Sequence, residues 1–151
     1  MITAYFDGAV EPVNPGGTAS YGAVVFREGE RLWECSELFR PEKGRERETS
    51  NNVAEYCGFL AVLDYLIATG LDEQNCEIRG DSKLVIEQML GNWQIRGGVY
   101  KPLALRALAR LREFRQRPAL RWIPRDENGI ADELSKAELK KAGVKFQIQS
   151  A

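Results

Sequence analysis

Apolar residues alternate with polar or aromatic ones from Ile2 to Asp7. A period of two is typical of a β-strand with one buried face. Gly8 and a loop rich in proline and glycine follow, so the strand is expected to end at Asp7. A carboxylate there loses hydration unless it is hydrogen-bonded, paired or bound to a cation. Taken alone, Asp7 is most simply a loop cap or half of an ion pair.

The same pattern predicts two further strands over residues 18–27 and 31–39, joined by a tight turn at 28–30. These three strands should form an antiparallel meander. Two shorter apolar segments, at 77–80 and 120–123, are predicted to be the fourth and fifth strands.

Apolar residues at helical spacing predict four helices. The first is expected to begin at Asn52 as its cap, with Glu55 at capping-box distance, and to end at Gly70. The second runs from 81–82 to Gly91, and the last covers 130–142. The third covers 101–117, with an apolar stripe of Leu105, Leu108, Leu111 and Phe114.

The predicted order is βββ-α-β-α-α-β-α. Strands joined through helices should be parallel with right-handed crossovers. The fold class is therefore α/β, with a five-stranded mixed sheet covered by helices on both faces. With 151 residues, one domain is expected over 1–144, followed by a short tail at 145–151.

Composition narrows the class of protein. Hydrophobic content of 44% and charged content of 28% are ordinary for a globular domain. A run of 18 apolar residues and an N-terminal signal pattern are both missing from the sequence, so a cytoplasmic protein without membrane association is expected. The odd set of Cys35, Cys57 and Cys76 is spaced unlike a zinc site and is interpreted as small buried residues.

The charge distribution is uneven although the net charge is only −1. Residues 99–125 contain eight basic residues and one acidic residue, a local charge of +7. Such a stretch is either the solvated face of a helix or a surface that attracts phosphates. The sequence contains no histidine, which excludes histidine-based acid–base or metal chemistry.

Four carboxylates occupy strand ends or helix starts: Asp7, Glu55, Asp81 and Asp132. Such positions converge on one edge of a sheet of this kind, where ligands usually bind. Converging carboxylates repel one another unless cations neutralise them, and an oxygen-only site favours Mg²⁺ or Mn²⁺ over zinc. Each residue also has a simpler structural role, as capping-box partner, acceptor of helix amides or helix-dipole residue.

At these residues the sequence resembles type 1 ribonuclease H, and the match follows the family's order over nearly the whole chain. The matching segments are Asp7-Gly8, Asn14-Pro15-Gly16-Gly17, Ser50-Asn51-Asn52-Val53-Ala54-Glu55, Asp81-Ser82, Trp122-Ile123-Pro124-Arg125, Asn128 and Ala131-Asp132.

The resemblance implies cleavage of the RNA strand of RNA/DNA hybrids, leaving 5′-phosphate and 3′-hydroxyl ends. The four carboxylates would hold two Mg²⁺ ions, one activating water and one steadying the leaving 3′ oxygen. Asn14, Asn51 and Asn52 match positions that contact the hybrid's minor groove, and Ser50 one that grips a DNA phosphate. Lys83 and Arg125 are expected to contribute substrate affinity.

Two departures from the family stand out. The loop 124–127 is shorter than in many bacterial members and lacks their mobile histidine, and Arg125 cannot shuttle protons. The loop 91–98 is too short for the extra basic helix of some members, and a separate N-terminal hybrid-binding domain is not expected either. Weak, salt-sensitive substrate binding is therefore predicted.

Three other interpretations remain open: a module that binds hybrids without cutting them, a different nuclease or strand-transfer enzyme on the same scaffold, and four unrelated structural carboxylates. The complete carboxylate set argues against a pure binder, because extra negative charge weakens phosphate binding. A monomer is expected.

Overall fold

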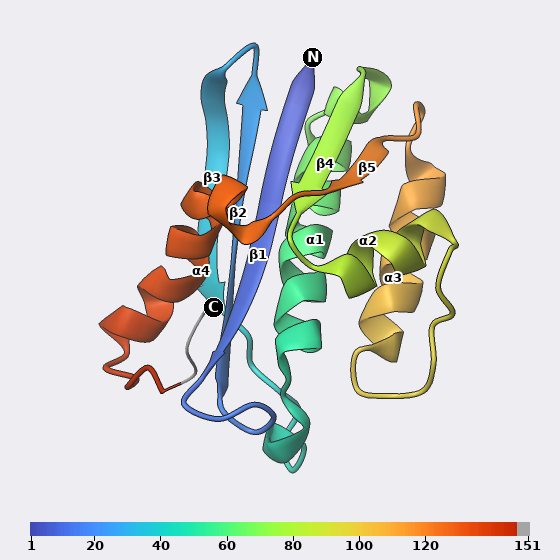
Figure 1. The fold of residues 1–151 in the computed structure, drawn as a ribbon. Coiled ribbons are helices and arrows are strands. Elements are labelled where there is room, and N and C mark those ends of the chain that lie inside the picture. The colour runs from blue at the N-terminus through green and yellow to red at the C-terminus, as the bar shows by residue number, and fades with distance from the viewer. Residues whose placement is uncertain (148–151) are drawn as a thin grey trace.

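The computed structural model describes residues 1–147, and the element order predicted from the pattern is confirmed (Figure 1). The last part of the predicted tail, 148–151, lies outside the described residues. Three short 3₁₀ helices add to the main elements, at Glu46–Glu48, Leu71–Glu73 and Arg125–Glu127. The strands and helices are β1 Ile2–Glu11, β2 Thr18–Arg27, β3 Glu30–Leu38, α1 Asn51–Ala68, β4 Cys76–Gly80, α2 Lys83–Leu90, α3 Lys101–Glu113, β5 Ala119–Trp122 and α4 Gly129–Lys141.

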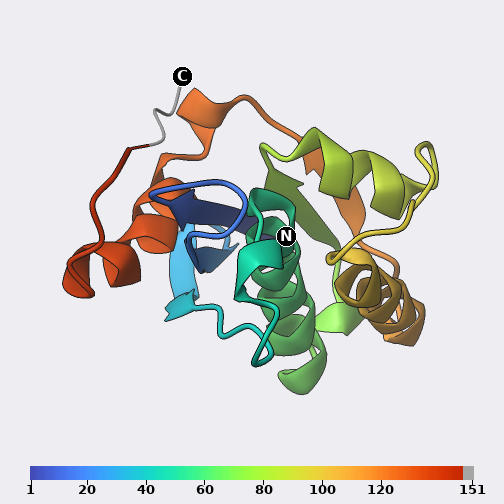
Figure 2. The ribbon, with the colours of Figure 1, turned by 90° about the horizontal axis from the view of Figure 1, so that it is seen from below.

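The five strands form one mixed sheet in the order β3-β2-β1-β4-β5. β1, β2 and β3 are antiparallel neighbours, and β4 and β5 run parallel to β1. Helix α1 packs on one face with α3 beside it, and α4 packs on the other face (Figures 1 and 2). The predicted two-sided α/β architecture is therefore confirmed. No helix within residues 1–147 has the length and apolar character to cross a membrane.

Strand β1 is longer than predicted, because it continues past Asp7 to Glu11. Its parallel pairing with β4 stops at Phe6 opposite Gly80, but its antiparallel pairing with β2 extends to Glu11 opposite Thr18. The expectation that Asp7 ends the strand is wrong. Asp7 instead lies at the point where β1 has lost its neighbour on one side, which leaves room for a site.

Glycines allow both layers of helices to approach this point closely. A Cβ atom on Gly8 would lie only 2.4 Å from the backbone of Ala54 and Glu55 in α1. On the opposite face, a Cβ on Gly22 would lie 2.5 Å from Leu134 in α4. Contacts this short are forbidden by van der Waals repulsion, so only glycine permits this packing.

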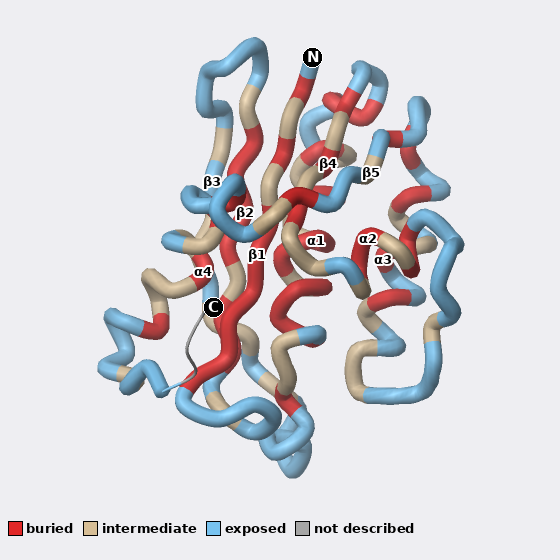
Figure 3. Tube along the Cα trace, in the orientation of Figure 1, coloured by how far each residue is buried: buried red, intermediate tan, exposed pale blue. Residues whose placement is uncertain are grey.

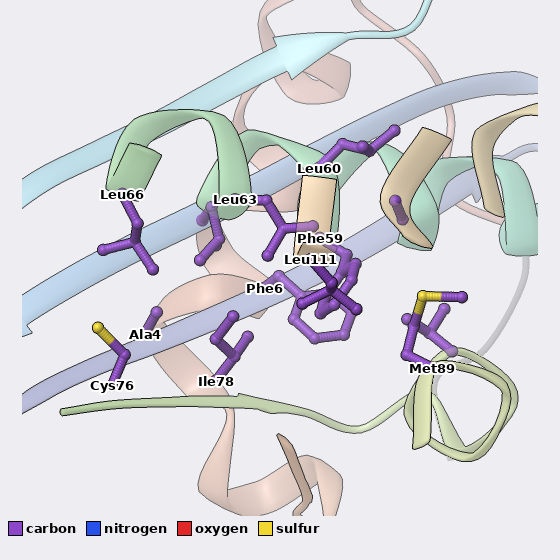
Figure 4. Packing of buried hydrophobic residues seen from close by; sticks show 14 of the residues in the cluster. Ala4, Phe6, Phe59, Leu60, Leu63, Leu66, Cys76, Ile78, Met89 and Leu111 are labelled. Atoms are coloured by element: carbon purple, nitrogen blue, oxygen red, sulfur yellow. The ribbon is translucent and has the colours of Figure 1, made fainter. Parts of the chain in front are cut away.

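The main core lies between the sheet and α1 (Figures 3 and 4). Phe6 and Phe59 are fully buried there, with ring centroids 5.3 Å apart in an edge-to-face arrangement. Burial of each ring stabilises the fold by about 1.5–3 kcal/mol relative to exposure. The apolar face of β1 is thus held against α1, and its opposite face carries Asp7.

Helix α3 is shorter than predicted and ends at Glu113. The chain leaves the helix because the backbone amides of Arg115 and Gln116 donate to the side chain and carbonyl of Asp72. Leu105 is 51% exposed, so it does not belong to the buried stripe. Leu111 and Phe114 of the predicted stripe are buried and Leu108 is half-buried. Ala104 and Ala107 are buried as well, and these small residues let α3 lie close to α1.

The cysteine interpretation is confirmed only in part. Cys76 is buried, but Cys35 and Cys57 are half-buried, and all three are free thiols. The first residues of the predicted tail, up to Gln147, form no helix or strand. The backbone amide of Gln147 donates to Oε1 of Glu11, 2.7 Å away, so this segment returns to the end of β1.

Candidate metal centre

The fold brings three of the four predicted carboxylates together. Asp7 comes from β1, Glu55 from α1, and Asp81 follows β4. One carboxylate oxygen from each residue lies within 4.8 Å of the other two. The close contact of Gly8 with α1 sets Glu55 beside Asp7, and the parallel pairing of β1 and β4 sets Asp81 there.

This cluster is buried and only partly hydrogen-bonded. Asp7 is 1% and Glu55 5% exposed. The backbone amide of Gly8 donates to Oδ1 of Asp7, but Oδ2 of Asp7 and Oε2 of Glu55 are buried without a donor. Buried carboxylate oxygens usually have partners, so these atoms are unsatisfied ligands.

Burial and mutual repulsion shift the acidity of these groups. Burial, with the neighbouring charge of Asp81, raises the pKa of Asp7 to about 8. Burial and the charge of Asp7 raise the pKa of Glu55 well above its usual value. Burial also raises the pKa of Asp81, although the nearby Arg125 guanidinium opposes this. Each ionised carboxylate is therefore costly here, and a divalent cation would remove that cost.

Asp132 lies in the first turn of α4, as predicted, at the border of the cluster. It is not in the group of three whose oxygens converge, but its charge and hydrogen bonding contribute to the raised pKa of Asp7. Its Oδ2 lies 3.2 Å from Nζ of Lys136, and its Oδ1 is buried without a donor. Asp132 thus offers one oxygen to the site while Lys136 contacts the other.

Arg125 and Asn128 both approach Asp81. Nε of Arg125 lies 4.0 Å from Oδ2 of Asp81. Nδ2 of Asn128 lies 3.0 Å from the carbonyl of Phe6 and 3.5 Å from Oδ1 of Asp81. The sequence motif included Asn128, but its role as the link between β1 and Asp81 was not predicted. The sequence carries no local signal for this link, because it depends on contacts with β1 and with the residue that follows β4.

The start of α1 differs from the prediction. Ser50, not Asn52, is the N-cap, and its Oγ accepts a hydrogen bond from the amide of Val53. The cap lies two residues earlier because the loop before it is held by Gly16, whose amide donates to the carbonyl of Thr49. Glu55 is therefore the fifth residue of the helix, beyond the first turn and beyond capping-box distance. The capping-box role that the sequence allowed for Glu55 is therefore excluded.

The predicted hybrid-contacting asparagines lie near this helix start. Oδ1 of Asn14 accepts from the amide of Asn51, 3.2 Å away, and Nδ2 of Asn51 lies 3.5 Å from Oε1 of Glu55. Asn52 is exposed. Asn14, Ser50 and Asn51 thus form one polar rim beside the carboxylates.

Lys83 lies on the other side of Asp81, at the start of α2. Its ammonium group lies 5.2 Å from the ring centroid of Trp122, whose Nε1 donates to the carbonyl of Asp81. Arg125 thus lies near Asp81, and Asn14 and Asn51 lie near Glu55, whereas Asn52 is exposed and Lys83 contacts Trp122.

A mixed sheet in the order 3-2-1-4-5 with an acidic, oxygen-only centre on β1 and β4 defines the ribonuclease H-like class of protein. The profile of the reverse transcriptase-like family matches residues 5–138. The chain belongs to this family and, within it, to the type 1 ribonucleases H.

Two curated relatives illustrate the relationship. Ribonuclease HI of Halobacterium salinarum is 33% identical over 141 residues, covering 93% of this chain and 65% of the relative. The bifunctional protein Rv2228c of Mycobacterium tuberculosis is 38% identical over 122 residues, covering 81% of this chain. The match covers only 31% of that mycobacterial protein, so the chain corresponds to about a third of its length.

Two solved structures share the fold. The N-terminal RNase H domain of Rv2228c, solved as a fusion with maltose-binding protein, has a TM-score of 0.80 at 33% identity and covers 94% of this chain and 95% of its own. LC11-RNase H1 in complex with an RNA/DNA hybrid also has a TM-score of 0.80, at 32% identity, covering 94% and 99%.

Proposed function

We propose that this chain is an endonuclease that hydrolyses the RNA strand of RNA/DNA hybrids, leaving 5′-phosphate and 3′-hydroxyl ends, and that it acts as a monomer. The observation that carries the proposal is the convergence of Asp7, Glu55 and Asp81 with oxygens that have no donor. A relative of the same fold, LC11-RNase H1, has been solved with an RNA/DNA hybrid.

The donor set fits a hard divalent cation, and the proposal assigns two Mg²⁺ ions to it, with Mn²⁺ as a substitute. It consists of carboxylate oxygens alone, which hard cations prefer. Asp7, Glu55, Asp81 and Asp132 would hold the ions, since three of these four side chains carry a buried oxygen without a partner. When bound, the ions supply a nucleophilic water and stabilise charge on the attacking and leaving oxygens.

The surrounding residues would bind and orient the substrate. The amides of Asn14, Asn51 and Asn52 can donate and accept, as contacts to 2′-hydroxyls and base edges in the minor groove require. Ser50 has its Oγ engaged as the helix cap, so its contribution to a DNA phosphate would come from the helix start that it stabilises. Lys83 and Arg125 would neutralise phosphates on either side of Asp81.

The test is cleavage of an end-labelled RNA/DNA hybrid with Mg²⁺ by the natural sequence and by Asp81→Asn. Asp126→Asn is the matched control, because it removes one carboxylate from the exposed turn beside the site. Cutting of the RNA strand by the natural sequence and by Asp126→Asn, but not by Asp81→Asn, is expected. Phosphatase treatment of the products should remove a 5′-phosphate and leave the 3′ end unchanged.

RNA duplex and single-stranded RNA serve as substrate controls. Hybrid that stays intact with both Mg²⁺ and Mn²⁺ but is bound by the protein would contradict the proposal and favour a binding module. Equal cutting by Asp81→Asn would disprove the role of the carboxylates.

A further inference from the structure

A cavity of about 450 Å³ lies on the α4 side of the sheet, outside the carboxylate cluster. Its walls come from β1, β2, β4 and the start of α4, and they include Tyr5, Phe26, Arg79, Asn128 and Gly129. Among the described residues, α4 leaves the upper ends of these strands uncovered in Figure 1. The volume falls in the range of small-molecule sites.

The floor of the cavity combines two aromatic rings with the guanidinium group of Arg79. The rings of Tyr5 and Phe26 meet edge to face, with centroids 6.0 Å apart. The Arg79 guanidinium lies 5.5 Å from the Tyr5 centroid. Arg31, which is ion-paired with Glu34 and lies outside the lining, is 5.7 Å from the Phe26 centroid. Nucleobases stack on both kinds of planar group.

Arg79 is the basic residue in the lining of the cavity, and Glu127 is the acidic one. Nε of Arg79 lies 2.5 Å from Oε1 of Glu77, and Nη1 donates to the Tyr5 hydroxyl. Arg121 also approaches Glu77, at 3.9 Å, so two arginines share one carboxylate. These contacts fix the Arg79 side chain and leave its Nη2 for an anion. Glu127 lines the cavity as well, and it is an exposed residue.

The wall nearest the carboxylates is Asn128, which is 1% exposed. Its Nδ2 donates to the carbonyl of Phe6, but its Oδ1 is buried without a donor. A buried acceptor left unpaired destabilises the fold by about 1–3 kcal/mol. This oxygen has no exposed surface, so an amino group of a ligand pairs with it only when the Asn128 side chain turns toward the cavity.

We propose that this cavity binds a nucleoside monophosphate unit. The base stacks on the rings of Tyr5 and Phe26, its exocyclic amino group faces Asn128, and the phosphate binds Arg79. This unit is either a free nucleotide or one nucleotide of an unpaired RNA strand. The inference rests on the cavity and not on cleavage of hybrids.

The cavity lies next to the carboxylate cluster, so a ligand bound in it affects the residues that hold the cluster. Tyr5 and Arg79 each precede a carboxylate, Asp7 and Asp81, by two residues on the same sheet face, which is about 7 Å along a strand. Asn128 contacts both the cavity and Asp81. Occupancy of the cavity therefore acts on the residue that orients Asp81.

The test is a titration of ¹⁵N-labelled protein with 5′-AMP in EDTA, followed by NMR. Amide shifts confined to Tyr5, Arg79 and residues 129–131 are expected. Arg79→Gln should weaken binding at least tenfold. Gly129→Phe should do the same by filling the cavity, since a Cβ at Gly129 meets no atom within 4 Å. Arg45→Gln, which removes an exposed arginine far along the chain, is the matched control and should bind normally.

Adenosine and inorganic phosphate test the two halves of the ligand, and each should bind more weakly than 5′-AMP. A short single-stranded oligoadenylate separates the two sources: tighter binding than 5′-AMP at the same residues identifies an RNA strand, and weaker binding identifies a free nucleotide. No shifts at millimolar 5′-AMP, shifts at the carboxylates instead, or unchanged binding in both variants would overturn the proposal. None of these readouts depends on hybrid cleavage, so the two proposals can fail separately.

Discussion

Two buried aspartates in this protein lie in opposite circumstances. Asp72 is 6% exposed, near the end of α3, and Asp7 is 1% exposed in β1. Oδ2 of Asp72 accepts from the amide of Arg115, and its backbone carbonyl accepts from Gln116. Oδ2 of Asp7 has no donor, and other carboxylates surround it.

This difference between Asp72 and Asp7 shows that burial alone does not identify a functional carboxylate. Asp72 uses its oxygens to end a helix and to hold the chain that follows, with the Arg115–Glu73 ion pair beside it. The oxygens of Asp7 are left for a ligand outside the chain. Unsatisfied hydrogen-bonding capacity distinguishes the second kind of residue from the first.

Exchange of each aspartate for asparagine should separate the two roles most strongly. Asp7→Asn is expected to lower hybrid cleavage by about 1,000-fold or more, because a metal ligand is lost. Asp72→Asn is expected to keep cleavage and lose about 1 kcal/mol of stability, because one hydrogen bond weakens. Steady-state cleavage and urea unfolding measure the two effects. A comparable loss of activity in both variants would contradict the different roles assigned to Asp7 and Asp72.

The link between β1 and Asp81 should matter for both stability and activity. Asn128→Ala leaves the buried carbonyl of Phe6 without a donor, which is expected to lower the free energy of unfolding by about 1–3 kcal/mol. Cleavage should fall by about 10–100-fold, as for partners that orient metal ligands. Asn92→Ala removes an exposed asparagine bonded to Glu87 and serves as the control. If Asn128→Ala lost stability but kept full activity, its role would be structural only.

The metal-free protein should become less stable as pH rises. Burial raises the pKa of Asp7 from 3.8 to about 8, so the folded state binds this proton more tightly than the unfolded state. Its contribution is therefore fully present below a pH of about 4 and is lost as pH rises through about 8. Thermal unfolding in EDTA across this range measures the slope.

Asp7→Asn should flatten that slope, and Mg²⁺ should reverse it, because the cation binds the ionised carboxylates. The rise in melting temperature on adding Mg²⁺ should therefore grow with pH. If the natural protein in EDTA instead gained stability as pH rises, with the same slope as Asp7→Asn, the raised pKa assigned to Asp7 would be contradicted.

The smallest expected effect concerns the basic side chains near Asp72 and near the carboxylate cluster. Arg115 near Asp72 pairs with Glu73, whereas Lys83 near Asp81 lies over Trp122 and forms no ion pair within residues 1–147. Lys83→Ala should weaken hybrid binding a few-fold and reduce the slope of affinity against salt by about one. Lys43→Ala, an exposed change in a loop, should alter neither quantity. An unchanged salt slope in Lys83→Ala would show that Lys83 contacts no phosphate.

Much of the fold could be predicted because its elements follow simple periods. The strand at 18–27 was predicted with its bounds and the second helix with its end at Gly91, because hairpin and capping residues mark them. The end of β1 could not be predicted, because Gly8 is a breaker by propensity and a strand residue through its pairing with Tyr21. Leu105 was assigned to the buried side of α3 because a period alone does not show that alanines occupy it.

The site could be predicted as a set of residues but not as a geometry. Asp7, Glu55 and Asp81 were identified by residue type and position, and their convergence came from the sheet register. The helix cap at Ser50 and the link through Asn128 depend on contacts with distant loops and strands. Such contacts leave no local pattern in the sequence.

The contact between Gly8 and α1 has a further consequence for the metal centre. Strand and helix meet there backbone to backbone, without an intervening side chain. The spacing of Asp7 and Glu55 is therefore a property of two main chains in contact and does not depend on rotamers between them. Because Gly8 has no Cβ atom, the distance between these two ligands is fixed by the closest approach of the two backbones.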